Sequence, residues 1–73
     1  MTIAAIKNII DFAEGGAIQS IVVSGERISF SDGKSQGTCE YSLNEEDGVL
    51  QINDQRGTLF AAVENINAIQ MTL

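Results

Sequence analysis

Apolar residues in the first stretch of the chain recur at the spacing of an α-helix. Ile3, Ile6 and Ile10 are separated by three and four residues, which places them on one helical face. Thr2 is a residue type that caps helix starts, and two consecutive glycines follow the stretch and are suited to end it. The pattern predicts a helix over residues 2–14.

The rest of the chain changes to the alternating pattern of short strands. Tyr41 and Leu43, for example, are apolar residues that alternate with polar ones. Near the end, Val63, Ile66 and Ile69 are three apart, which predicts one helical turn before a last strand that ends in "IQMTL". The predicted strands before that turn are 17–23, 27–31, 38–43, 49–53 and 58–63.

These elements predict a single α+β domain over residues 1–73. An N-terminal helix precedes five or six short antiparallel strands, which we expect to form a small barrel or a curled sheet. The order resembles that of small SH3-like or Sm-like barrels, in which a turn of helix often precedes the closing strand. Here "AVENINAIQM" occupies that place, although the glycines and asparagine of the Sm signature are not found at matching spacing.

The charge balance restricts the kinds of partner. Ten acidic residues against four basic ones give a net charge of −6. Such a chain repels nucleic-acid backbones and anionic membranes, so we expect neither as a direct partner. The basic residues are scattered, and Lys7 and Asp11, four apart on the predicted helix, can pair, though in the less favourable orientation. The composition fits solubility alone, a cationic protein partner, or imitation of nucleic acid.

The chain has few of the residue types that catalytic and metal sites commonly use. The chain has no histidine, which removes the usual proton shuttle and a common zinc ligand. Its one cysteine, Cys39, cannot form a disulfide within the chain and is expected to be a small buried apolar residue. We therefore predict a protein that is not an enzyme and binds no cofactor or metal.

The run "NEEDG" at 44–48 is the most concentrated group of acids. It separates two predicted strands, and its Asp-Gly pair favours a tight hairpin turn. The spacing does not match a calcium loop, because the first ligand position falls on Leu43. We interpret the run as a solvated hairpin tip, with contact to another protein as the alternative.

The predicted helix carries more apolar residues than one core-facing stripe needs. Its surplus, Ala5, Ile9 and Phe12, either covers an open end of the barrel or contacts another chain. The final strand is similarly a candidate edge for pairing between molecules.

Together these features predict a non-enzymatic protein-interaction module. One hypothesis is a phage accessory protein, acting in the host cytoplasm, whose acidic face inhibits a host protein by filling its basic nucleic-acid groove. The alternative is a structural or self-assembling component that forms homo-oligomers through the helix and edge strand. Either way we expect a cytoplasmic protein. The candidate protein-binding residues are Glu40, Glu45, Glu46, Asp47, Asp54, Ile9 and Phe12.

Overall fold

The computed structural model describes residues 1–13, 16–30, 40–54 and 56–72, which form one α-helix, six strands and one 3-10 turn. The expected α+β class, with an N-terminal helix before antiparallel strands, is confirmed. The predicted loop at 32–37 and Cys39 lie outside these residues. In chain order the elements are α1 (Ile3–Phe12), β1 (Ala17–Val23), β2 (Glu26–Ser29), β3 (Glu40–Asn44), β4 (Val49–Asp54), β5 (Gly57–Ala62), η1 (Val63–Asn65) and β6 (Ile66–Thr72).

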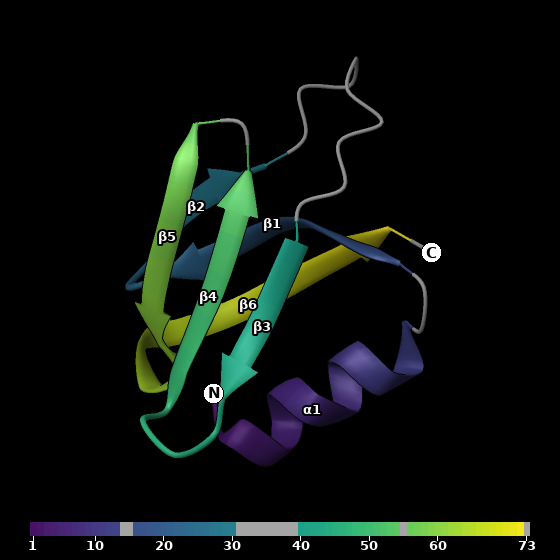
Figure 1. Cartoon of the computed structure of the whole chain (residues 1–73), viewed down its shortest axis with the longest axis vertical. Helices are drawn as coiled ribbons and strands as arrows, with labels where there is room; N and C mark the ends of the chain where they lie inside the picture. Colours follow the sequence, from purple (N-terminus) through teal and green to yellow (C-terminus); the bar gives the residue numbers. More distant parts are fainter. Residues whose placement is uncertain (14–15, 31–39, 55, 73) are drawn as a thin grey trace.

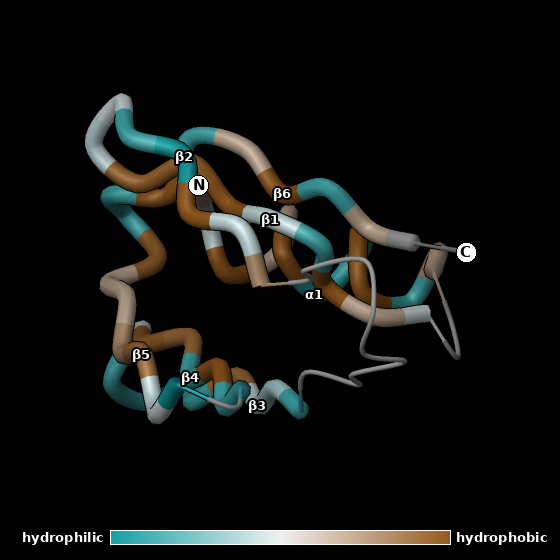
Figure 2. Tube along the Cα trace, turned by 90° about the horizontal axis from the view of Figure 1, so that it is seen from above, coloured by the Kyte–Doolittle hydropathy of each residue, from teal (hydrophilic) through white to brown (hydrophobic). Residues whose placement is uncertain are grey.

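The strands are divided between two antiparallel sheets (Figure 1). One sheet has the order β2-β1-β6 and the other the order β3-β4-β5. Seen from above, they form two layers, with α1 beside β1 and β6 (Figure 2). No ladder joins the two sheets within the described residues, so a closed barrel, one of the two expected arrangements, is not found there. The η1 turn redirects the chain from β5 in one sheet to β6 in the other.

The hydrophobic core lies between the two sheets and under α1. Both sheets contribute aliphatic side chains to it, and α1 contributes Ile6, which is 0% exposed. Since burying one such side chain is worth about 1.5–3 kcal/mol, this shared core stabilises the stacking of the sheets. Its members are Ile6, Ile18, Ile21, Leu50, Ile52, Ala61, Val63 and Ile66.

The last strand begins earlier than the sequence predicts, since the two-residue spacing of Ile69, Met71 and Leu73 places its start near Ile69. The expected helical turn is present as η1, but β6 starts at Ile66, directly after it. The pairing of β6 with β1 is irregular at two places, one of them between Val22 and Val23. Because such an irregularity shifts the side-chain alternation, Ile66 and Ile69 both pack on the core although they are three apart.

The start of α1 is fixed by a cap and by the chain terminus. The Thr2 hydroxyl accepts a hydrogen bond from the backbone N–H of Ala5 at 3.1 Å, which confirms the predicted cap. The amino group of Met1 donates to the carbonyls of Val63 and Ile66 at 2.8 and 2.7 Å. The first turn of the helix is therefore attached to η1 and to the start of β6.

Candidate functional site

An apolar groove lies between the second half of α1 and the second half of β6. Its volume is about 360 Å³. Ile69 and Met71 of β6 are half-buried and form one wall, and residues of α1 form the other. We call this feature the α1–β6 groove. Its lining residues are Asn8, Ile9, Phe12, Ala13, Ile69 and Met71.

The helical period explains why Ile9 and Phe12 line this groove. At 3.6 residues per turn, these two residues and Ala5 lie on one flank of α1, about a quarter turn from the core-facing Ile6. Ile9 is half-buried, whereas Phe12 is 82% exposed. The apolar surplus predicted from the sequence is thus incompletely covered by the chain itself.

The helix ends earlier than expected. Its last residue is Phe12, and Ala13 is the C-cap, whose backbone N–H donates to the carbonyl of Ile9 at 3.1 Å. Glu14 and Gly15, which belonged to the predicted helix and its end, lie outside the described residues. Phe12 consequently stands in the last turn of α1, where it lines the α1–β6 groove.

The acidic run forms the predicted hairpin tip between β3 and β4. The Asn44 side chain accepts a hydrogen bond from the backbone N–H of Asp47 at 3.0 Å and donates one to its carboxylate, also at 3.0 Å. Gly48 adopts a φ of +67°, as a tight turn favours, and its N–H donates to the Asn44 carbonyl. Glu46 is exposed at this tip.

The tip contacts α1 through one ion pair. The Lys7 ammonium lies 3.3 Å from the Glu45 carboxylate, so Lys7 pairs across the fold instead of with Asp11 on its own helix. Both side chains are about half exposed, and such a pair is worth about 0–1 kcal/mol. Lys7 is on the flank of α1 away from Phe12, which places the acidic tip and the α1–β6 groove on opposite sides of the helix.

The five acids predicted to form a binding face lie at two ends of the β3–β4 hairpin. Glu45, Glu46 and Asp47 form the tip, whereas Glu40 pairs in register with Asn53 at the other end. Four residues of strand separate Glu40 from the tip, or about 14 Å. Asp54 follows Asn53 at that second end and has partners of its own. The structure therefore does not bring these acids into one cluster.

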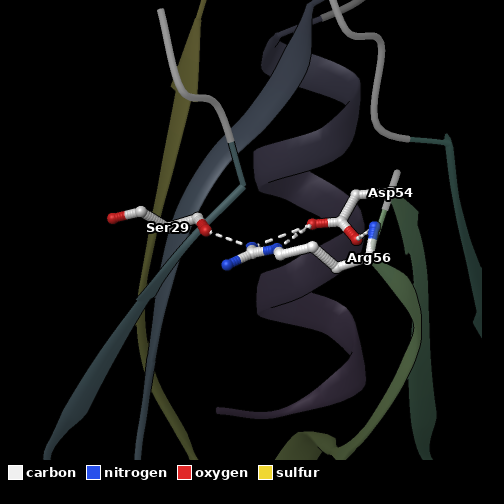
Figure 3. A network of polar contacts seen from close by, with 3 residues as sticks. All are labelled: Ser29, Asp54 and Arg56. Atoms are coloured by element: carbon white, nitrogen blue, oxygen red, sulfur yellow. Dashed lines mark hydrogen bonds and ion pairs between the residues drawn. The ribbon is translucent and has the colours of Figure 1, made fainter.

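Arg56 connects the two sheets at the end of β4 (Figure 3). Its Nε and Nη2 atoms donate to the Asp54 carboxylate at 3.1 and 2.9 Å. Nη2 also donates to the backbone carbonyl of Ser29 in β2, at 2.5 Å. Since Asp54 belongs to one sheet and Ser29 to the other, we call this group the Arg56 clasp.

The clasp changes the acidity of Asp54. The hydrogen bonds from the Arg56 guanidinium hold the pKa of the Asp54 carboxyl below its usual range, against the opposing effect of partial burial. Backbone hydrogen bonds from Arg56 and Gly57 act in the same direction as the guanidinium. The Asp54 side chain is 13% exposed, so its charge is largely directed at the clasp and not at solvent.

Replacing Arg56 by glutamine is expected to raise the pKa of Asp54 toward the unperturbed value of about 3.9. In the wild-type protein the folded pKa is lower than the unfolded one. The clasp's contribution to stability is thus complete above the unfolded pKa and is lost as the pH falls through the folded pKa. A ¹³C NMR titration of the Asp54 carboxyl measures both midpoints. Arg27→Gln is the charge-matched control, and a wild-type midpoint at or above 3.9 would contradict the expectation.

One exposed aromatic residue was not identified from the sequence. Phe60 on β5 is 65% exposed and pairs in register with Gln51 of β4, which in turn pairs with Ser42 of β3. Its neighbours across the sheet are polar, and the α1–β6 groove does not include it. Alternation along β5 could have indicated that Phe60 faces away from the buried Ala61.

Within 1–13, 16–30, 40–54 and 56–72, no three His, Cys, Asp or Glu side chains lie where they could hold a metal ion. In the same part of the chain, no helix has the length and apolar character needed to cross a bilayer.

Comparisons with protein-family models, with curated protein sequences and with solved structures gave no match to this chain.

Proposed function

We propose that this protein is a non-enzymatic interaction module that binds a segment of another protein in the α1–β6 groove. The observation that carries the proposal is Phe12, a large aromatic side chain that is 82% exposed beside an apolar hollow. Covering such a side chain is worth about 1.5–3 kcal/mol, a substantial share of a micromolar binding free energy of about 8 kcal/mol.

A comparison with Phe60 supports the choice of surface. A single exposed apolar side chain is normal on a folded protein and needs no explanation. Phe60 is such a case, because polar residues flank it across the sheet. Phe12 differs because Ile9 and the half-buried Ile69 and Met71 line a hollow beside it, where a second apolar side chain has room.

The two elements that form the α1–β6 groove are each held in place by the rest of the fold. Ile6 anchors α1 in the core, and β6 is paired with β1 along its length. A binding surface on rigid elements loses little conformational entropy when a partner binds. The strand order, with η1 before the last strand, also supports the finer proposal of an SH3-like arrangement for the two sheets.

Selection from a random-peptide display library tests the proposal without knowledge of the natural partner. We expect peptides that bind the wild-type protein and the Phe60→Gln variant but bind Phe12→Gln at least about tenfold more weakly. The two variants remove the same exposed side chain at different places, and circular dichroism checks that both are folded. Failure to enrich any peptide, or enrichment of peptides that bind Phe12→Gln equally well, would contradict the proposal.

A further inference from the structure

The end of α1 beside the α1–β6 groove is electrically unbalanced. The C-terminal turn of a helix carries partial negative charge from its unpaired carbonyls, which basic side chains usually offset. The last turn of α1 contains no basic residue. It contains the exposed Asp11, directly before Phe12, so a carboxylate adds to the negative end of the helix dipole.

The basic residues of the described part of the chain do not offset this charge. Lys7 is one turn away and pairs with Glu45. Arg27 donates to Ser20 and Gln70, and Arg56 belongs to the clasp. None of these three lines the α1–β6 groove. Within the described residues, then, no basic side chain offsets the negative end of α1, and this end of the groove is complementary to a positively charged partner.

A second copy of this chain is a poor occupant for the same reason. Each copy carries a net charge of −6. In a two-fold interface the same patch meets itself, which brings Asp11 and the negative helix end of one copy toward those of the other. Anionic lipids and nucleic acids meet the same repulsion.

On the basis of the proposed function, we infer that the natural occupant of the α1–β6 groove is a basic segment of a partner protein. One bulky apolar side chain of that segment occupies the hollow between Ile9, Phe12 and Met71. Lysine or arginine residues next to it in sequence lie against Asp11 and the carbonyls at the end of α1. The volume of about 360 Å³ is at the lower end of the range of binding pockets, about 300–1,000 Å³, and suits such a single anchor.

The test uses three fluorescein-labelled synthetic peptides and measures their affinity by fluorescence anisotropy. The first has a core of alanine, leucine, phenylalanine and alanine between pairs of lysines. The second has glutamates in place of the lysines, and the third has serines in place of leucine and phenylalanine. We expect the first to bind at least about tenfold more tightly than either of the others, and its affinity to fall between 50 and 500 mM salt.

Variants of the protein locate the binding. Phe12→Gln is expected to weaken binding of the first peptide at least about tenfold. Asp11→Asn is expected to weaken it about two- to fivefold. Glu26→Gln removes the same charge at the start of β2, where Glu26 pairs with Val23 at the end of β1, and is expected to leave the affinity unchanged. Binding of the first peptide that is insensitive to Phe12→Gln would overturn the inference, because charge attraction alone would then explain it.

Three further outcomes separate this inference from the proposed function. If lysine and glutamate peptides bind equally and both depend on Phe12, the basic partner is wrong and the proposed function stands. If no peptide binds and light scattering finds a dimer that Phe12→Gln dissociates, the occupant is a second copy and the inference is overturned. A monomer that binds none of the peptides, and selects none from the random library, would overturn both.

Discussion

Truncation of Ile6 to alanine is expected to unfold a large fraction of the protein. Ile6 is 0% exposed and is the buried residue of α1 that joins the core shared by both sheets. Replacing such a side chain by alanine costs about 2–5 kcal/mol, because transfer free energy is lost and a cavity remains. A single core of this size supplies about 3–5 kcal/mol in total. Urea unfolding followed by circular dichroism measures the change in the free energy of unfolding.

A graded series distinguishes core packing from helix propensity in this experiment. Ile6→Val keeps most of the buried volume and is expected to cost about 0.5–1.5 kcal/mol. Ile9→Ala makes the same change as Ile6→Ala at a half-buried position and is expected to cost less. If Ile6→Ala cost no more than Ile9→Ala, the docking of α1 would not belong to the core, and the α1–β6 groove would lack its support.

The elements that the sequence predicted well depend on local periodicity. The apolar spacing of α1 and the alternation of β3 and β4 follow directly from which side of each element faces the core. Tyr41 and Leu43 face inward and Glu40 and Ser42 outward, as the alternation indicated. The predicted turn at 44–48 was found for the same reason, since its asparagine, aspartate and glycine act on their own neighbouring backbone.

The features that the sequence could not predict depend on contacts between distant parts of the chain. The start of β6 was misplaced because the irregular pairing with β1 disturbs its alternation. The sequence indicated Asp11 as a possible partner of Lys7, whereas Glu45 is brought to Lys7 only by the packing of the β3–β4 hairpin beside α1. Neither effect leaves a local pattern in the sequence.

The candidate binding surfaces also depend on contacts that the sequence does not reveal. The apolar surplus of α1 was visible in the sequence, but only the tertiary structure distinguishes the exposed Phe12 from the half-buried Ile9. The predicted acidic face combined residues that are close in sequence but lie at two ends of a hairpin. Asp54, one of its members, is held by Arg56 through a contact that also reaches β2.

Substitution of Gly57 is expected to be the most costly change in a turn. Gly57 has a φ of +138°, far outside the left-handed region near +50 to +70° that asparagine tolerates. Nothing lies within 4 Å of the place where a β-carbon would stand, so the cost arises from the backbone and not from crowding. We expect Gly57→Ala and Gly57→Asn each to lower the free energy of unfolding by about 1–3 kcal/mol.

Gly48 provides the matched control for this prediction. Its φ of +67° lies in the left-handed region, and an added β-carbon would meet Val63 at an ordinary contact distance of 3.7 Å. Gly48→Asn is therefore expected to cost less than about 1 kcal/mol. Urea unfolding of the three variants tests the difference, and equal losses for Gly57→Asn and Gly48→Asn would contradict it.

The position of Gly57 gives the substitution a second consequence. Gly57 pairs with Asp54 where β4 and β5 join, and its backbone helps to lower the pKa of the Asp54 carboxyl. This junction is at the end of the molecule opposite α1 (Figure 1). The Arg56 clasp links the two sheets at this end, whereas α1 contributes Ile6 to their shared core. We thus expect Gly57→Ala to raise the Asp54 titration midpoint as well as to destabilise the fold, whereas Gly48→Asn leaves that midpoint unchanged.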